Sequence, residues 1–211
     1  MVQIIPAIIA KSFEELQEKI DKVSPYSDWA QIDVSDGIYT PNVTWNNPKE
    51  LPNLKTNLNL EIHLMINNPE NHITDWVKAG AKRIIVHINS KNDYQKINKI
   101  SEILKNKNVQ LAIALNPNIS VEEIQNLIPL ADTILLLAVT PGFSGQMIQP
   151  IILEKIKKLR ELFPGVKIEV DGGINPETAK ECIKFGADIL VSQNYIFSSN
   201  NIKEAIESLK K

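Results

Sequence analysis

The sequence is poor in cysteine and in aromatic residues, and it has no excess of positive charge. Among its 211 residues there is one cysteine, Cys182, which has no partner for an internal disulfide, so we expect a reducing compartment. The formal net charge of −2 argues against a nucleic-acid partner, because proteins that bind the phosphate backbone are usually clearly basic. With 43% hydrophobic but only 6% aromatic residues, the core must be mostly aliphatic.

Long hydrophobic runs are also missing. No segment reaches the ~18 uninterrupted apolar residues that a membrane helix needs, so we expect no membrane partner. The N-terminal segment has no basic region, and Pro6 interrupts its short apolar stretch. We therefore expect residues 2–9 to form a strand rather than part of a signal peptide, and a cytoplasmic location is the default expectation.

Short aliphatic runs alternate with amphipathic, charged segments along the chain. Strands are expected at residues 2–9, 29–34, 59–65, 83–88, 109–115, 133–139, 166–171 and 188–192. Helices are expected at residues 12–23, 69–79, 93–105, 120–128, 150–162, 176–185 and 201–210. Ser12, followed by Glu15, has the capping-box pattern of a helix start. Residues 35–57 show little helical pattern.

This alternation is typical of a parallel sheet with helical crossovers. Eight strand–helix units close into a (β/α)8 TIM barrel, for which about 200 residues is the lower end of the usual size. An open, doubly wound sheet is the alternative, but no GxGxxG pattern follows the first strand. We therefore expect one TIM-barrel domain over residues 1–211, with any active site at the C-terminal ends of its strands.

Ionisable side chains lie near the ends of three expected strands. Asp33 ends the second strand, His63 lies near the end of the third, and Asp171 ends the seventh. An aspartate at such a junction is often only the N-cap of the next helix, and a single histidine is often structural. Three such groups at one barrel mouth are costly to bury without a task. His87, inside the fourth strand, is expected to be packed or hydrogen-bonded within the barrel.

Two glycine-rich turns lie in the second half of the chain. Residues 140–146 (TPGFSGQ) follow the sixth strand, and Gly172 and Gly173 follow the seventh. Glycines let backbone N–H groups approach an anion, and barrels commonly bind phosphate with their last loops. Tight turns need glycine in any case, but this joint placement favours a phosphorylated small substrate.

Short motifs run in order through nearly the whole chain. They are IPAII at 5–9, DVSDG at 33–37, PNVT at 41–44, HLM at 63–65, LNP at 115–117, VTPGFSGQ at 139–146, VDGG at 170–173, GAD at 186–188 and IF at 196–197. Together they resemble the ribulose-phosphate 3-epimerase family. The resemblance implies a TIM barrel and an isomerase of the pentose phosphate pathway, which interconverts ribulose 5-phosphate and xylulose 5-phosphate.

The resemblance also implies roles for individual residues. Asp33 and Asp171 would be the acid/base carboxylates: one removes the C3 proton, which the C2 ketone acidifies, and the other returns a proton on the opposite face. Asp33, His63 and Asp171 would hold a divalent metal, usually zinc and otherwise manganese or iron, together with a second histidine. The implied contacts to substrate and phosphate are His63, Met65, Gly142, Phe143, Ser144, Gly145, Gly172, Gly173, Gln193 and Asn194.

The departures from the family pattern fall within this site. Gln31 stands where the family has its second metal-binding histidine, and an amide oxygen is a poorer zinc ligand than imidazole. Ala7 replaces a serine near the substrate, and Gln193 and Asn194 replace a Gly-Ser pair that contacts phosphate. These changes keep the carboxylate pair but weaken the metal and phosphate sites, so the metal is one feature that this chain could have lost.

Three functions therefore stay open. The first is a working epimerase with a weakly bound or absent metal, in which Gln31 and His63 donate hydrogen bonds to the enediolate. The second is a barrel enzyme that acts on a different sugar phosphate or ketone, and the third is a non-catalytic member that binds a ligand or partner. Decarboxylation or aldol chemistry, which related barrels perform with D-x-K-x-x-D on the third strand, is disfavoured because that strand offers no lysine. A homo-oligomer is also expected to be feasible, because exposed barrel faces often pair.

Overall fold

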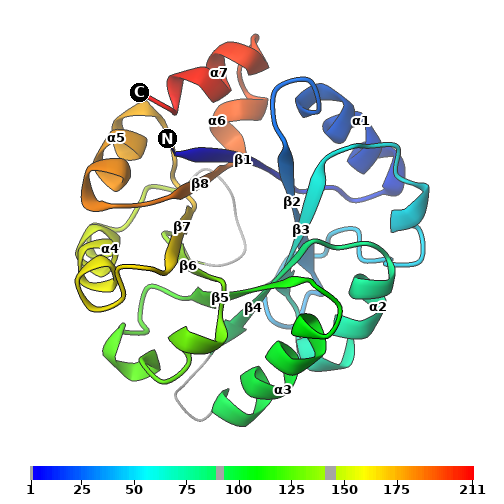
Figure 1. The fold of residues 1–211 in the computed structure, drawn as a ribbon. Helices are drawn as coiled ribbons and strands as arrows, with labels where there is room; N and C mark the ends of the chain where they lie inside the picture. Colours follow the sequence, from blue (N-terminus) through cyan, green and yellow to red (C-terminus); the bar gives the residue numbers. More distant parts are fainter. Residues whose placement is uncertain (1, 89–92, 141–145) are drawn as a thin grey trace.

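The computed structural model describes residues 2–88, 93–140 and 146–211, and its strands form a closed barrel (Figure 1). All neighbouring strands are parallel and follow the chain order, and the last strand pairs with the first through Gln3 and Ile189. Helices surround this barrel as an outer ring. The (β/α)8 TIM barrel expected from the sequence is confirmed.

The expected strands are all present and differ from the sequence prediction by at most two residues at either end. They are β1 (Gln3–Ile8), β2 (Trp29–Ser35), β3 (Asn59–Met65), β4 (Arg83–Ile88), β5 (Gln110–Leu115), β6 (Thr133–Leu137), β7 (Lys167–Asp171) and β8 (Ile189–Ser192). The α-helices are α1 (Phe13–Val23), α2 (Ile73–Lys78), α3 (Tyr94–Lys105), α4 (Ile151–Leu162), α5 (Pro176–Phe185), α6 (Asn194–Phe197) and α7 (Ile202–Ser208).

The prediction of an α-helix at residues 120–128 is wrong. Two short 3-10 turns, Glu122–Ile124 and Ile128–Leu130, occupy this region instead. Pro129 has no N–H to donate and disfavours α-helical geometry at Ile128, so it prevents an α-helix from continuing past this point, but it does not explain the 3-10 turn at Glu122–Ile124. The helix expected at 69–79 is likewise shorter, because a 3-10 turn at Pro69–Asn71 precedes α2.

The start of α1 forms half of the expected capping box. The hydroxyl of Ser12 accepts a hydrogen bond from the backbone N–H of Glu15. The Glu15 carboxylate, however, accepts from the backbone N–H of Lys11 and from the Lys19 ammonium group, not from the N–H of Ser12. The N-cap itself is therefore as the sequence predicts, while the glutamate secures the turn one residue earlier.

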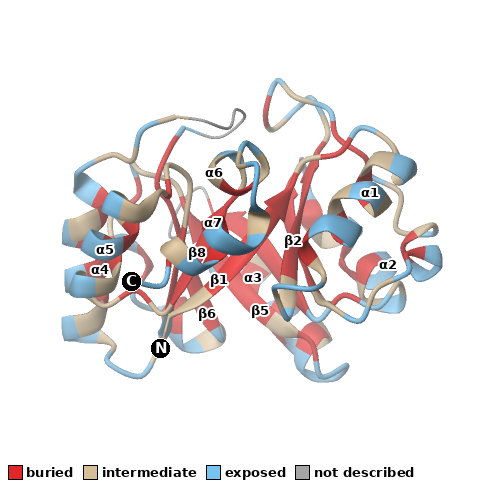
Figure 2. Cartoon of the chain, turned by 90° about the horizontal axis from the view of Figure 1, so that it is seen from above, coloured by how far each residue is buried: buried red, intermediate tan, exposed pale blue. Residues whose placement is uncertain are grey.

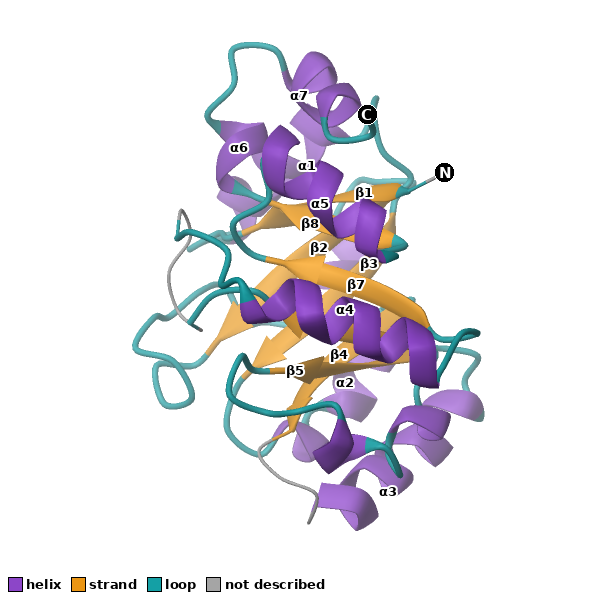
Figure 3. Cartoon of the chain, turned by 90° about the vertical axis from the view of Figure 1, so that its left-hand side faces the viewer, coloured by secondary structure: helices purple, strands orange, loops and turns teal. Residues whose placement is uncertain are grey.

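Aliphatic side chains fill the space between the barrel and its helices, as the composition predicts. Figure 2 shows buried strands between helices whose outer faces are exposed. Helix α3 packs on β5 and α4 packs on β6, and Figure 3 shows these helices on the outside of the barrel. Within the described ranges, no helix combines the length and the apolar character that a bilayer-spanning segment needs.

The inside of the barrel is polar at its N-terminal end. Arg83 donates to Glu61 at 2.5 Å and to Glu169 at 3.1 Å, and its Nε donates to Gln110 at 3.0 Å. The guanidinium group lies 4.6 Å from the centre of the Trp29 ring. Burial raises the pKa of both glutamates, that of Glu61 well above its usual value. This group, which we call the barrel floor, closes the end of the barrel opposite the strand ends where a site is expected.

Candidate active site

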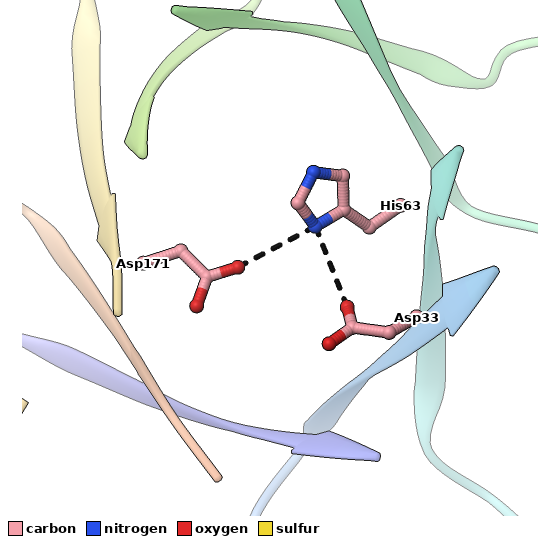
Figure 4. Close-up of side chains that lie close together, drawn as sticks. All are labelled: Asp33, His63 and Asp171. Atoms are coloured by element: carbon pink, nitrogen blue, oxygen red, sulfur yellow. Dashed lines mark ion pairs between the residues drawn. The ribbon is translucent and has the colours of Figure 1, made fainter. Parts of the chain in front are cut away.

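Asp33, His63 and Asp171 converge inside the mouth of the barrel. Asp33 and His63 are direct neighbours across β2 and β3, and Asp171 is the last residue of β7. Nδ1 of His63 lies 3.4 Å from Oδ1 of Asp33 and 3.4 Å from Oδ2 of Asp171, so both carboxylates approach the same ring nitrogen (Figure 4). In the described chain neither aspartate is a helix N-cap, so capping of the next helix does not explain either residue.

Gln31 is a fourth member of this group. It lies on the same face of β2 as Asp33 and is fully buried. Its amide nitrogen donates to Asp33 Oδ1 at 2.8 Å and to Asp171 Oδ2 at 2.8 Å, and it lies 3.3 Å from His63 Nδ1. Its amide oxygen is buried and has no hydrogen-bond partner among the described residues. The residue that departs from the family pattern therefore stands at the centre of the site.

The two carboxylates control the charge of the site. Burial alone would lower the pKa of His63, but the hydrogen bonds and charges of Asp171 and Asp33 raise it to about 10. Burial also raises the pKa of Asp33, an effect that the hydrogen bond from His63 opposes in part. A carboxylate with a raised pKa is better suited to accept and return a proton near neutral pH.

A chain of side chains extends from His63 across the barrel. His63 Nε2 lies 2.8 Å from His87 Nε2, and the two rings stack with their centres 5.0 Å apart. His87 Nδ1 lies 3.1 Å from Asn116 Oδ1, while Asn116 Nδ2 donates to the Tyr39 hydroxyl at 3.0 Å. Because the amide oxygen of Asn116 can only accept, the His87 proton lies on Nδ1, and His87 Nε2 accepts from His63. Burial holds the pKa of His87 well below its usual value, which is consistent with this neutral form.

The loop after β2 is fastened close to the carboxylates. The Thr44 hydroxyl donates to the backbone oxygen of Asp33 at 2.7 Å and accepts from the backbone N–H of Ser35 at 2.8 Å. The Asp36 carboxylate accepts from three backbone N–H groups, and these bonds lower its pKa despite partial burial. The sequence showed these residues only as part of a motif, and their role in holding Asp33 was not predicted.

A cavity of about 410 Å³ opens above the convergent groups. Among the sequence-predicted residues that line it are Asp33, His63, Met65, Asp171, Gly172, Gly173, Gln193 and Asn194, and Ala7 also borders it. The predicted contacts Gly142, Phe143, Ser144 and Gly145 lie outside the described residues. No lysine or arginine is found among the lining residues that the structure describes, so a phosphate group there would meet neutral donors.

The two glycines after β7 are required by the backbone. Gly172 and Gly173 have φ angles of +104° and +68°, which residues other than glycine rarely adopt. A Cβ atom on Gly173 would lie 2.5 Å from the backbone nitrogen of Ile148, and one on Gly172 would lie 2.6 Å from a methyl group of Val139. The turn therefore needs glycine for its conformation and packing, and the glycines alone do not identify an anion site.

Comparisons with known proteins agree with the motifs. The model of the ribulose-phosphate 3-epimerase family matches residues 3–197. The ribulose-phosphate 3-epimerase of Chlamydia muridarum is 41% identical over 185 residues, covering 83% of this chain and 79% of that protein. The enzyme of the same name from Bacillus subtilis is 33% identical over 218 residues, covering 100% of this chain and 99% of that protein.

Solved structures show the same architecture at lower identity. The crystal structure of 3-hexulose-6-phosphate synthase covers 99% of this chain and 98% of its own, with a TM-score of 0.76 and 20% identity. At that identity the likeness supports the barrel fold alone, whereas the family model and the sequence relatives extend through the site. The chain therefore belongs to the ribulose-phosphate 3-epimerase family, a family of isomerases.

Proposed function

We propose that this chain interconverts ribulose 5-phosphate and xylulose 5-phosphate by proton transfer at C3 through an enediolate. The observation that carries the proposal is the pair of carboxylates, Asp33 and Asp171, which reach the cavity from strands on different sides of the barrel. Inversion at a carbon needs one acid/base group on each face of the substrate. The names of the sequence relatives support the choice of substrate.

The protein groups divide the reaction between them. One carboxylate removes the C3 proton of a ketose held between the pair, and the other, entering the step protonated, donates a proton to the opposite face. The reverse reaction exchanges the two roles. His63, which lines the cavity, has an N–H group beside both carboxylates, and such a fixed donor stabilises the negative charge that develops on the enediolate oxygens. The two N–H groups of Gln31 are donated to the carboxylates and hold them in place.

Three of these side chains could also hold a divalent metal such as zinc, manganese or iron. One ligand atom each from Asp33, His63 and Asp171 lies within 4.8 Å of the others. The fourth side chain, Gln31, directs its N–H groups and not a lone pair at the same atoms. As arranged, the two carboxylates and His63 surround a hydrogen-bond donor, the amide group of Gln31, and this arrangement suits a donor better than a cation.

A different phosphorylated ketose is the second candidate substrate. Gln193, which lines the cavity, has a buried amide oxygen without a partner in the described part of the chain. An acceptor there favours a substrate with a hydroxyl donor at this end. Gln193 and Asn194 are also bulkier than the Gly-Ser pair implied by the resemblance, so the space for substrate differs from the family pattern.

Incubation with ribulose 5-phosphate in D₂O tests the proposal. We expect deuterium at C3 and the appearance of xylulose 5-phosphate by NMR. Asp33→Asn and Asp171→Asn should each reduce exchange by roughly 10²–10⁴-fold, because each removes one acid/base group while keeping the side-chain shape. If the wild type exchanges no C3 proton of ribulose 5-phosphate but does exchange that of another ketose phosphate, the second candidate replaces the first. No exchange with any ketose phosphate would favour a binding role.

We also propose a cytoplasmic location and self-association. The buried thiol of Cys182 supports a reducing compartment, because it has no disulfide partner. Exposed Ile38 and Val43 near the mouth support a contact with a second copy. Light scattering on the purified protein tests the second proposal, since a monomer at all concentrations contradicts it.

A further inference from the structure

The carboxamide of Gln31 lies between the three side chains that could bind a metal. Its nitrogen is 2.8 Å from Asp33 Oδ1, 2.8 Å from Asp171 Oδ2 and 3.3 Å from His63 Nδ1. The same three residues form the group whose ligand atoms all lie within 4.8 Å of one another. The side chain is fully buried, so bulk water does not compete for these contacts.

An ion and this amide group compete for the same acceptor atoms. A cation binds through lone pairs of the carboxylates and of a neutral imidazole nitrogen. The two N–H groups of Gln31 already point at one oxygen of each carboxylate, and an amide nitrogen has no lone pair to offer a cation in exchange. Any ion that enters must therefore displace two charge-assisted hydrogen bonds, which are among the stronger ones in proteins.

Rotation of the carboxamide does not remove this conflict. Turning it over would direct Oε1 at Asp33 and Asp171, so that three acceptors would face one another unless a cation were present. The observed orientation leaves Oε1 buried without a partner among the described residues, a loss that the two bonds to carboxylates outweigh. The residue type at position 31 thus favours the site without an ion.

We propose that Gln31 takes the place of a divalent cation in this protein. Its two N–H groups bridge Asp33 and Asp171, hold the two carboxylates at a fixed separation, and make the site independent of metal. The metal-binding part of this inference stands on the geometry alone, whereas its catalytic part rests on the proposed epimerase function.

Titration with Co²⁺, whose visible absorption reports its ligands, tests the metal-binding part. Gln31→His supplies a lone pair in place of the N–H groups, and we expect it to bind one Co²⁺ per chain. Wild type should bind roughly 100-fold more weakly or not at all, because the ion must displace two charge-assisted hydrogen bonds. Gln31→Leu, which removes the two competing hydrogen bonds without supplying a ligand atom, is the matched control: it should bind Co²⁺ more tightly than the wild type and more weakly than Gln31→His, and binding as weak as that of the wild type would show that the missing ligand, not competition by the amide group, excludes the ion.

The wild type alone gives a second measurement if a variant fails to fold. Metal analysis after purification should find well under one equivalent of zinc, manganese or iron, and added Zn²⁺ should not raise Tm, since only a ligand that binds the folded state does so. One tightly bound equivalent, or Co²⁺ binding as tight as that of Gln31→His, would overturn the proposal.

Catalysis is tested separately with the C3 exchange assay. If the wild type epimerises, exhaustive dialysis against a chelator should leave its rate within about twofold, and loss of activity that zinc restores contradicts the proposal. If the wild type does not exchange ribulose 5-phosphate at all, the proposed function fails, while the Co²⁺ titration still decides whether Gln31 excludes a cation.

Discussion

At the scale of single residues, the hydrogen-bond partners of the two imidazole rings in the mouth determine which ring nitrogens carry a proton. His63 touches two carboxylates through Nδ1 and a second imidazole through Nε2. His87 must accept from His63, because its other nitrogen donates to Asn116. His63 therefore presents N–H groups on both sides in the protein without substrate, and it can act as a donor to an oxygen anion.

The charge of His63 predicts how stability depends on pH. Its pKa is raised in the folded protein from 6.5 to about 10, so the folded state keeps a proton that the unfolded state releases between these values. The stabilisation is complete below about pH 6.5 and is lost as the pH rises through about 10. We expect the free energy of unfolding of the wild type, relative to His63→Gln, to fall over this window in urea titrations. A difference that stays constant from pH 6 to about 10 contradicts the raised pKa.

The sequence predicted these residue positions better than their contacts. Their positions at the C-terminal ends of parallel strands predicted that Asp33 and Asp171 share one mouth, and the resemblance identified Gln31 as a departure. Neither could show that the Gln31 amide nitrogen bridges both carboxylates, because that contact depends on side-chain torsions of residues from β2 and β7. The contact between His63 and His87 was missed for the same reason.

At the scale of elements, the chain from His63 through His87 and Asn116 joins β3, β4 and the end of β5 to the loop that carries Tyr39. Hydrogen-bond partners of this kind fix the orientation of an imidazole ring without contacting the substrate themselves. The strands were predictable from aliphatic runs, whereas this cross-strand chain has no local sequence signal. The resemblance marked Asn116 only as a motif residue, and its hydrogen bond with His87 connects it to the site.

Asn116→Leu tests this positioning role. It removes the acceptor that fixes the His87 proton, so we expect kcat to fall by roughly 10-fold with a smaller change in KM. Asn116→Asp keeps an acceptor for His87 and should retain more activity, and Tyr39→Phe is the control for the outer end of the chain. The ring ¹⁵N shifts of His63 and His87 should change in Asn116→Leu; unchanged shifts would show that Asn116 acts only on stability.

Helix α4 supports the loop after β5, which begins with Asn116, from outside the barrel through Lys155. This buried ammonium group donates to the backbone oxygens of Asn116, Pro117 and Ile119. We expect Lys155→Met to lower the free energy of unfolding by about 1–3 kcal/mol, because three carbonyl groups lose their donor. Lys157→Met, on an exposed face of the same helix, should change it by less than about 0.5 kcal/mol, and equal effects of the two variants in urea titrations would contradict this role.

At the scale of the whole molecule, the barrel has two polar ends with different purposes. The mouth opens to a cavity, while in the barrel floor Arg83 packs against the Trp29 ring and both carboxylates are buried. Glu169 and Asp171 lie two residues apart on β7 and therefore on the same face, and strand alternation alone does not show that one belongs to the floor and the other to the mouth. What separates them is the depth of each residue in the barrel, which depends on the register of all eight strands.

The barrel floor predicts a second pH effect, on stability alone. One guanidinium group, that of Arg83, faces two buried carboxyl groups, and burial raises the pKa of Glu61 well above the usual 4.5 and raises that of Glu169 as well. The folded protein therefore keeps a carboxyl proton that the unfolded chain releases. This stabilising contribution is present at low pH and is lost as the pH rises through the raised pKa.

Glu61→Gln should remove this loss, because its amide group stays neutral and can donate to Glu169 at every pH. We expect the Tm of Glu61→Gln, relative to that of the wild type, to increase steadily as the pH is raised from 4.5 into the alkaline range. Glu181→Gln, on the exposed surface of α5, should follow the wild-type profile and is the matched control. Parallel profiles for Glu61→Gln and the wild type would mean that both floor carboxylates are ionised, and that Arg83 alone compensates for two buried charges.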